Sequence, residues 1–395
     1  MTTTINNEHK KLNVPNLRFP EFQGEWEKFT FDEIAQYKKG PFGSALKKDL
    51  FVPQSENAIK VYEQQNAIKK DWTLSRYYIT KDYFNTYMKQ FVAKAGDLIV
   101  SCAGTIGEVY ELPKDAEEGV FNQALMRVRV NNEIVNKEIF ITVFSSMIDK
   151  FSKIYSNGSA IKNIPPFADL KRTQVYLPCK EEQIVIAQLL RSLDERIATQ
   201  NKIIEDLKKL KSAISKRLLC NDKWTTYKIH DIAEIGRGRV ISSVEIDRQK
   251  HPLYPVYSSQ TSNDGIMGYL DSYMFDGEYI TWTTDGANAG TVFYRKGKFN
   301  CTNVCGTLKI QPKFDCYFVS LVLQQATQKY VSSNLANPKL MNNTMASIKI
   351  RMPNIETQKQ LSKVFQTLDS CLLVHQRTCK MYLSEKQYLL CQMFI

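Results

Sequence analysis

The chain has 395 residues, a formal net charge of +12 and a pI near 9.1. This length predicts two or three domains. The excess of Lys and Arg favours a polyanionic partner such as nucleic acid, although on charge alone a merely basic protein is equally compatible. The nine cysteines include no Cys-x-x-Cys pair and no apolar run approaches about 18 residues, which excludes a zinc ribbon, a disulfide framework and a membrane span. We therefore expect a cytoplasmic protein with reduced thiols.

The first 178 residues predict a polar arm followed by a mixed globular unit. Residues 1–20 are polar, contain two prolines and are expected to form a flexible N-terminal arm. Within 21–178, the patterns at Leu98–Ser101 and Leu125–Val130 predict strands, and Glu138–Phe151 predicts a helix. This unit is long enough to bury a core of its own.

A long amphipathic helix is predicted next, within a central segment at 179–221. Over 181–219, its apolar positions alternate in steps of four and three residues, which is typical of a coiled-coil seam. The seam residues are Ile186, Leu190, Leu193, Ile197, Ile204 and Leu207. At about 1.5 Å per residue, such a helix is about 58 Å long.

Residues 222–353 predict a second mixed unit, and residues 354–395 predict a second long helix. In the second unit, Tyr279–Thr283 and Leu308–Ile310 predict strands, and Tyr317–Val331 predicts a helix. The helical pattern at 356–394 has a seam with the same spacing as the first. Its seam residues include Leu361, Phe365, Leu368 and Leu372.

The second half of the chain repeats the first. Segments that begin at Trp26 and Trp224, WEKFTFDEIAQYKKG and WTTYKIHDIAEIGRG, share the Trp, an Ile-Ala pair and a final Gly at an offset of 198 residues. The two helices match at an offset of 175 residues, and polar residues interrupt both seams at the same two places. The interrupting pairs are Gln200 with His375 and Lys211 with Lys386. A repeat of this length indicates one scaffold used twice.

We therefore predict an α+β protein in which two similar mixed α/β domains are separated by two long helices that form an antiparallel coiled coil. The shared register and the shared polar interruptions favour this pairing over two separate helices that each lie on their own domain. The second seam is the more polar of the two, since it contains His375 and Cys379.

The sequence contains no recognisable catalytic motif. Walker A, HExxH and GxSxG patterns are absent. The segment Asn163–Phe167 (NIPPF) resembles the Asn-Pro-Pro-Phe motif of amino-methyltransferases, but Ile164 separates the Asn from the prolines, so a loop is the favoured interpretation. Gly104–Gly107 and Gly286–Gly290 are too short for a phosphate-binding loop and predict structural turns. We expect neither a catalytic residue nor a metal site.

In each repeat, basic residues stand beside the glycine that ends the Trp segment, Gly40 or Gly238. A basic residue beside a turn can present donors to a base edge or a phosphate. Each of these residues taken alone is more often only a solvated charge, and the repetition favours the functional interpretation. The candidate DNA-binding residues are Lys38, Lys39, Lys47, Lys48, Lys162, Lys171, Arg172, Arg237, Arg239, Lys339 and Lys349.

Together these segments resemble the specificity subunit of type I restriction–modification enzymes. The resemblance is carried by the two Trp segments and by VPNLRFPEFQGEW (14–26), GDLIVSCAGTIGEVY (96–110), YPVYSSQTSNDGIMGY (254–269), ITWTTDGANAGTVF (280–293), LPCKEEQIVIAQLLRSLDERI (177–197) and the weaker copy MPNIETQKQLSKVFQTLD (352–369). It covers nearly the whole chain, through the order and duplication of these segments.

The resemblance implies a subunit without an active site, in which 21–178 and 222–353 are target-recognition domains that each read one half of an asymmetric, bipartite DNA site. The two helices set the spacing and dock two modification subunits, which methylate adenine, and restriction subunits add ATP-driven translocation and cleavage. S-adenosylmethionine, ATP and Mg²⁺ are then bound by the partner subunits, and no cofactor by this chain. Two alternatives stay open: a stand-alone DNA adenine methyltransferase, and a coiled-coil adaptor for acidic proteins.

Overall fold

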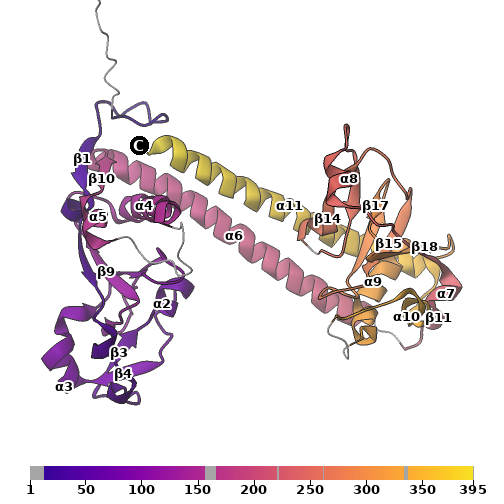
Figure 1. The fold of residues 1–395 in the computed structure, drawn as a ribbon, viewed down its shortest axis with the longest axis horizontal. Coiled ribbons are helices and arrows are strands. Elements are labelled where there is room, and N and C mark those ends of the chain that lie inside the picture. Colours follow the sequence, from indigo (N-terminus) through magenta and orange to yellow (C-terminus); the bar gives the residue numbers. More distant parts are fainter. Residues whose placement is uncertain (1–12, 156–165, 220–221, 261, 333–336, 395) are drawn as a thin grey trace, which may run out of the picture. The chain divides into compact units, whose positions relative to one another are not determined.

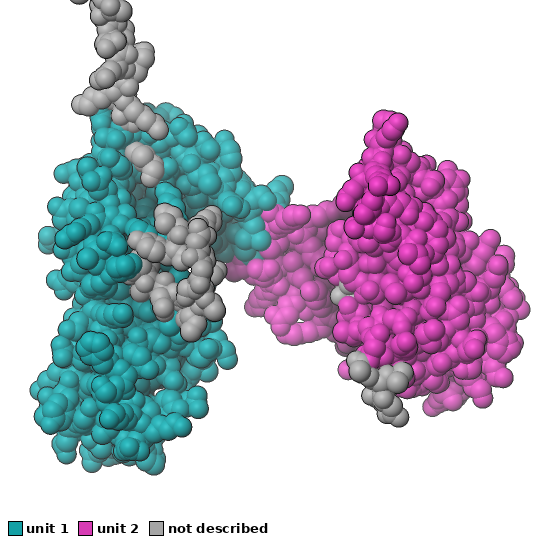
Figure 2. All heavy atoms as spheres, viewed as in Figure 1, with its two compact units in different colours: residues 1–197, 381–395 teal, residues 198–380 magenta. Residues whose placement is uncertain are grey.

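The structure, a computed structural model, describes residues 13–155, 166–219, 222–260, 262–332 and 337–394. It divides into two compact units (Figure 2). Unit 1 comprises residues 1–197 and 381–395, and unit 2 comprises residues 198–380. Each of the two long helices therefore contributes one part to unit 1 and the other part to unit 2.

The described part of unit 1 contains three sheets (Figure 1). The smallest pairs β1 (Glu27–Thr30) with β10 (Gln174–Leu177) in antiparallel orientation. A four-stranded antiparallel sheet has the order β2 (Ala35–Lys39), β9 (Leu125–Val130), β6 (Leu98–Ser101) and β7 (Val109–Glu111). A second four-stranded sheet has the order β4 (Tyr77–Thr80), β3 (Ala58–Tyr62), β8 (Gly119–Phe121) and β5 (Val92–Ala93), with β3 and β8 parallel.

The described part of unit 2 repeats this topology. A two-stranded antiparallel sheet joins β11 (Thr225–Lys228) to β19 (Lys349–Met352). The four-stranded antiparallel sheet has the order β12 (Ala233–Arg237), β18 (Cys305–Ile310), β15 (Glu278–Thr283) and β16 (Val292–Lys296). A third sheet has the order β14 (Ile266–Leu270), β13 (Tyr254–Tyr257) and β17 (Asn300–Cys301), with β13 and β17 parallel.

Other helices complete both units. Those of unit 1 are α1 (Phe31–Ile34), α2 (Gln64–Lys69), α3 (Lys81–Tyr83), α4 (Lys137–Tyr155) and α5 (Phe167–Arg172). Unit 1 also has 3-10 turns at Gly43–Ala45, Lys48–Leu50 and Lys89–Phe91 and a π-helical turn at Phe84–Met88. The helices of unit 2 are α7 (Ile229–Ile232), α8 (Ser243–Asp247), α9 (Cys316–Ala326) and α10 (Asn342–Ser347), with turns at Ser262–Gly265 and Thr327–Tyr330. The Asp315 carboxylate caps α9 by accepting a hydrogen bond from the N–H of Phe318 (2.7 Å).

The elements predicted from hydrophobic periodicity are confirmed. The strands at Leu98–Ser101 and Leu125–Val130 are found residue for residue as β6 and β9. The helix expected over Tyr317–Val331 is shorter as an α-helix, since α9 ends at Ala326 and continues as a 3-10 turn. At that point the buried Thr327 hydroxyl donates to the carbonyl of Gly290 (2.7 Å).

Each hydrophobic core combines a globular part with the long helices. In unit 1, the rings of Phe31, Phe140 and Phe144 pack together, and the same cluster includes Leu190 of α6 (Lys180–Leu218) and Met393 of α11 (Ile355–Met393). In unit 2, the cluster around Trp282 and Phe318 includes Phe365 of α11, whose side chain is fully buried. Burial of such aromatic side chains provides most of the favourable free energy of packing.

The two predicted long helices are present as α6 (Lys180–Leu218) and α11 (Ile355–Met393), each of 39 residues. Each begins and ends one residue before its predicted limit. Their contacts run in opposite directions along the chain: in unit 2, Lys211 pairs with Asp369 and the Gln200 side chain lies 2.7 Å from His375 Nδ1. The predicted antiparallel pairing is confirmed.

The polar interruptions of the two seams make matching contacts between the helices. Gln200 and His375, which are equivalent at the offset of 175 residues, form a hydrogen bond. In unit 1, Lys386 Nζ lies 2.5 Å from Asp194 Oδ1. This ion pair corresponds at the same offset to the pair of Lys211 with Asp369 in unit 2. All ten predicted seam side chains are buried or half-buried in the structure.

Candidate nucleic-acid interface

A close crossing of two backbone segments fixes the end of β2 in unit 1. Gly40 follows Lys39, the last residue of β2, and its N–H donates to the carbonyl of Leu125 (2.9 Å). A Cβ atom on Gly40 would lie 1.9 Å from the carbonyl oxygen of Asn122. Because no side chain fits at that distance, only glycine is compatible with this turn. We call this arrangement the glycine crossing.

Unit 2 has the same glycine crossing at the end of β12. The N–H of Gly238 donates to the carbonyl of Cys305 (3.1 Å), and a Cβ atom on Gly238 would lie 2.1 Å from the carbonyl oxygen of Cys301. Gly238 is the counterpart of Gly40 at the offset of 198 residues. The duplicated final glycine of the Trp segments therefore has the same physical cause in both units.

Each glycine crossing lies where two sheets of its unit meet. In unit 1, the N–H of Asn122 donates to the carbonyl of Tyr62 (3.1 Å), the last residue of β3. In unit 2, the N–H of Thr302 donates to the carbonyl of Tyr257 (2.9 Å), the last residue of β13. Residues just beyond each crossing are thus held by both sheets, which is a rigid base for a recognition loop.

Each unit buries a cation against the tyrosine that ends β3 or β13. In unit 1, Lys60 Nζ lies 5.1 Å from the ring centre of Tyr62, and in unit 2 the Arg295 guanidinium lies 3.6 Å from the ring centre of Tyr257. Burial lowers the pKa of both basic groups from their ordinary values. Cation–π contact and hydrogen bonds to backbone carbonyls offset part of the cost of burying these charges.

The two glycine-rich segments are structural turns, as predicted. They connect β6 to β7 and β15 to β16. The N–H of Gly107 donates to the carbonyl of Ser101, and the N–H of Gly290 donates to the carbonyl of Thr283, both at 2.9 Å. Gly107 and Gly290 both have φ of +82°, a region that L side chains rarely adopt.

Three exposed lysines stand in the chain beside the glycine crossing of unit 1 or shortly after it. Lys39 at the end of β2, and Lys47 and Lys48 shortly after it, are exposed and form no ion pair with any residue that the structure describes. Lys38 is held inward: its Nζ lies 2.8 Å from Gln90 Oε1 and 5.1 Å from the ring centre of Phe91. Lys39, Lys47 and Lys48, but not Lys38, are therefore available to phosphates.

The remaining candidates of unit 1 lie on other elements. Lys171 and Arg172 belong to α5, where Lys171 Nζ lies 2.8 Å from Asp32 Oδ1. Lys162 and residues 163–165 of the Asn163–Phe167 segment lie outside the described residues, and Phe167 is the first residue of α5. Among the predicted residues of unit 1, the structure thus brings Lys39, Lys47 and Lys48 together on one short stretch of chain.

In unit 2, two of the predicted basic residues lie beside the turn that connects β15 to β16. The N–H of Gly286 in this turn donates to the carbonyl of Pro338 (3.0 Å), and the neighbouring Lys339 Nζ lies 3.5 Å from Asp285 Oδ1. Arg237 is exposed, with Nη2 3.8 Å from the sulfur of Met341. Segment 337–341 therefore brings Lys339 near Arg237.

Arg239 and Lys349 are placed differently. Arg239 forms a double hydrogen bond with Glu245, one arm at 2.9 Å, and this contact raises the pKa of Arg239 and lowers that of Glu245. Lys349 is exposed on β19, opposite Lys228 of β11. Arg237 is therefore the predicted residue of unit 2 that lies directly beside the crossing glycine and forms no ion pair with a described residue.

Two exposed apolar residues at the crossings were not predicted. Phe42 and Val240 each stand two residues after the crossing glycine, and their side chains are 88% and 72% exposed. In the sequence, the Gly-Pro-Phe-Gly segment at 40–43 places a single aromatic residue between two glycines, next to lysines. That pattern would have indicated a displayed aromatic side chain.

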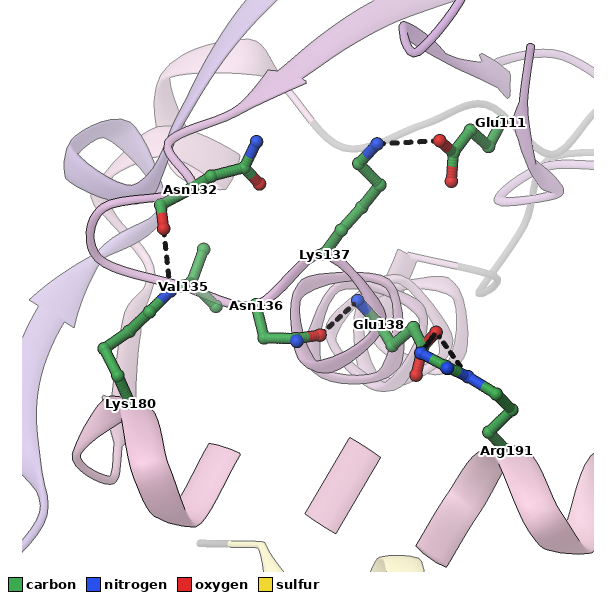
Figure 3. A pocket seen from close by; sticks show the side chains of 8 residues that line it. All are labelled: Glu111, Asn132, Val135, Asn136, Lys137, Glu138, Lys180 and Arg191. Atoms are coloured by element: carbon green, nitrogen blue, oxygen red, sulfur yellow. Dashed lines mark hydrogen bonds and ion pairs between the residues drawn. The ribbon is translucent and has the colours of Figure 1, made fainter. Parts of the chain in front are cut away.

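A hollow in unit 1 lies between the loop before α4 and the first turns of α4 and α6 (Figure 3). It is lined by Glu111, Asn132, Val135, Asn136, Lys137, Glu138, Lys180 and Arg191. Four of its charged side chains form two ion pairs, Lys137 with Glu111 at 2.7 Å and Arg191 with Glu138, and Lys180 Nζ donates to the carbonyl of Asn132 (2.7 Å). The pair of Arg191 with Glu138 attaches α4 to α6, and the pair of Lys137 with Glu111 attaches α4 to β7.

The described residues offer no cluster of His, Cys, Asp or Glu side chains that could hold a metal ion. None of the helices within the described part of the chain is both long enough and apolar enough to cross a membrane.

Comparison with known families decides which kind of protein this is. The family described as "Type I restriction modification DNA specificity domain" matches twice, over residues 23–209 and 221–380. The chain belongs to this family. Each matched stretch of the specificity-domain protein contains one glycine crossing, Gly40 in the first and Gly238 in the second.

A relative supports this assignment, and two solved structures share the fold. A Mycoplasma pneumoniae protein assigned as a type I specificity subunit is 36% identical over 219 residues, which are 54% of this chain and 81% of the relative. The crystal structure of a type I restriction–modification S subunit from M. genitalium covers 97% of this chain and 99% of its own, with a TM-score of 0.64 and 18% identity. A structure concerned with complex assembly of a type I R-M system covers 92% of this chain and 96% of its own, with a TM-score of 0.55 and 12% identity. These two structural likenesses concern the fold.

Proposed function

We propose that this specificity-domain protein is the non-catalytic, DNA-reading subunit of a type I restriction–modification complex. Residues 21–178 and 222–353 are its target-recognition domains, and each reads one half of an asymmetric bipartite site. The observation that carries the proposal is the duplicated glycine crossing, because the same backbone turn presents different side chains in the two units.

The side chains at the two crossings favour different contacts. Unit 1 presents Lys39, Lys47 and Lys48, which are compact charges suited to phosphate oxygens. Unit 2 presents Arg237, whose planar guanidinium can donate two hydrogen bonds to O6 and N7 of guanine in the major groove. This difference predicts two unlike half-sites rather than a palindrome.

The remaining candidate residues have supporting roles in this proposal. A carboxylate already balances the charges of Lys171, Arg239 and Lys339, so these side chains should contribute less to phosphate binding than the unpaired cations do. Lys38, Arg172, Lys349 and Lys162 extend the positive charge of the two units.

The paired helices supply the spacing and the docking surface. The ion pairs of Lys211 with Asp369 and of Lys386 with Asp194 fix their register. We infer that two modification subunits, each an adenine methyltransferase, dock on this pair and that restriction subunits join the complex. S-adenosylmethionine, ATP and Mg²⁺ belong to those partners, since the motifs for binding nucleotide or methyl donor are missing from this chain.

The alternatives make different predictions. A stand-alone DNA adenine methyltransferase would bind S-adenosylmethionine without partners, and a coiled-coil adaptor for acidic proteins would bind DNA without sequence preference or not at all. Nothing among the residues that the structure describes favours either of them.

A domain exchange combined with methylome sequencing tests the proposal. Cells receive the chain with its modification partner, and residues 21–178 are replaced by those of another family member. One block of the methylated site should change while the other block and the gap stay the same. A change of both blocks, or a palindromic site, contradicts the two-reader proposal.

Charge substitutions test the assigned contact residues in the complex with modification subunits. Lys39→Ala should weaken binding evenly across sequences and reduce the steepness of the salt dependence by about one phosphate contact. Arg237→Ala should cost about 1–3 kcal/mol and relax one position of its block. Lys114→Ala, three residues after the far end of β7, is the control for Lys39→Ala, and Lys296→Ala, at the far end of β16 and paired with Glu278 (3.1 Å), is the control for loss of a positive charge in unit 2. Unchanged binding by both test variants contradicts the choice of these turns.

A further inference from the structure

The two most exposed large apolar side chains among the described residues occupy equivalent positions of the two repeats. Phe42 is 88% exposed and Val240 is 72% exposed, and the two residues are separated by the same offset of 198 residues as Gly40 and Gly238. A single exposed apolar residue is ordinary on a protein surface. Two at matched places, each beyond a duplicated glycine crossing, indicate a shared use.

Both side chains are displayed by a fixed backbone. The Phe42 carbonyl accepts a hydrogen bond from the N–H of Ala45 (2.9 Å), and the preceding Pro41 is buried. The Val240 carbonyl accepts a hydrogen bond from Arg239 Nη1 (3.1 Å), and the following Ile241 is buried in a small core cluster. The backbone that carries each exposed side chain is therefore already ordered, so contact with a partner costs little further backbone entropy.

Basic residues that form no ion pair with a described residue stand close to both apolar side chains in the sequence. Lys39 and Lys47 lie three residues before and five residues after Phe42, and Arg237 lies three residues before Val240. Cations at this spacing can bring the neighbouring apolar side chain close to a phosphate backbone. At the edges of base pairs in the major groove, the one apolar group is the C5-methyl of thymine.

We infer that Phe42 and Val240 are base-contacting residues, each of which packs against the C5-methyl group of a thymine in the half-site read by its own unit. The inference rests on the proposed function, since it requires the glycine crossings to face DNA. The different sizes of the two side chains then contribute to the difference between the half-sites. A ring covers more of a base edge than an isopropyl group does, so the contact of Phe42 should be the larger.

The test removes one methyl group at a time from the DNA. Duplexes in which each thymine of the site is replaced singly by deoxyuridine are titrated with the chain in complex with its modification subunits. One replacement in the block of unit 1 should weaken wild-type binding about fourfold, which corresponds to one buried methyl group. Phe42→Ala should bind more weakly and lose its response to that one replacement. Its response to replacements in the other block should stay intact, and Val240→Ala should show the reverse pattern.

Controls separate this inference from the proposed function and from misfolding. Leu253→Ala removes a side chain that is 70% exposed at the opposite end of β13, and it should respond to deoxyuridine as the wild type does. Phe42→Leu should fold and retain part of the response. If Lys39→Ala and Arg237→Ala weaken binding but no deoxyuridine replacement distinguishes wild type from Phe42→Ala and Val240→Ala, the thymine contact is wrong and the proposed function survives. If none of these variants affects DNA binding, the crossings do not face DNA and both fail.

Discussion

Replacement of Gly40 by alanine should remove the ability of unit 1 to read its DNA block. The new Cβ would lie 1.9 Å from the carbonyl oxygen of Asn122, whereas Cβ contacts under 3.0 Å are essentially absent from real proteins. One backbone segment must therefore retreat by about 1 Å. That movement stretches the hydrogen bond from Gly40 to Leu125 and shifts the turn that carries Phe42.

The expected cost follows from these two effects. Overpacking costs about 1–3 kcal/mol, and a lost backbone hydrogen bond costs about 1 kcal/mol, so Gly40→Ala should destabilise unit 1 by about 2–4 kcal/mol. Gly43→Ala is the matched control, because its Cβ would meet nothing closer than the Gln123 side chain at 3.9 Å. Both substitutions reduce the entropy of the unfolded chain equally, and this contribution cancels in the comparison.

Two measurements check this prediction. Urea unfolding of the full chain should show the loss of stability for Gly40→Ala and not for Gly43→Ala. In binding assays with the modification subunits, Gly40→Ala should no longer distinguish the correct first block from an altered one, while the second block is still read. Gly238→Ala should give the opposite result. Equal behaviour of Gly40→Ala and Gly43→Ala would refute the steric argument.

Three further predictions concern the helices and the thiols. Four residues inserted after Leu207 lengthen α6 by about 6 Å and rotate its distal part by about 40°. The unread gap should then lengthen by one or two base pairs with both blocks unchanged, or binding should be lost. Methylation of the original site at the wild-type rate rules this prediction out. Leu193→Asp places a charge at a buried seam position and should cost about 3 kcal/mol in urea unfolding and weaken the modification-subunit complex; an unchanged midpoint contradicts it. Burial raises the pKa of Cys102 to about 12, so its thiolate is nearly absent at pH 8. An alkylating reagent should therefore label the exposed Cys371 first and Cys102 only on unfolding. Equal labelling rates of the two thiols in the native chain argue against this burial.

Hydrophobic periodicity was sufficient to predict the scaffold. The steps of four and three residues along α6 and α11 determine which face is buried, and this is a local property of the chain. Strands such as β6 and β9 were predictable because most of their side chains are apolar. The polar interruptions showed that the helices are equivalent. The direct contact between Gln200 and His375 depends on how the two helices pair, and it was seen only in the structure.

The details of the candidate interface depend on contacts between distant residues. The reason for Gly40 lies in Asn122, about eighty positions further along the chain, and no local pattern connects the two. The ion pairs of Lys171 with Asp32 and of Lys339 with Asp285 also join segments that are far apart in sequence. A sequence reading therefore finds the basic residues but cannot tell which of them are already paired.

Unit 1 combines an early segment of the chain with a late one, and this affects the order in which the two units fold during synthesis. The N–H of Leu17 donates to the carbonyl of Gln392 (2.9 Å), the ring of Trp26 packs edge-on against Phe394 at 6.1 Å, and Met393 belongs to the core of unit 1. These partners leave the ribosome only after the whole of unit 2 has been translated. The half that is made first must therefore wait with an open apolar face, and unit 2 can finish folding before it. Chaperones should accordingly bind nascent chains of this protein through unit 1.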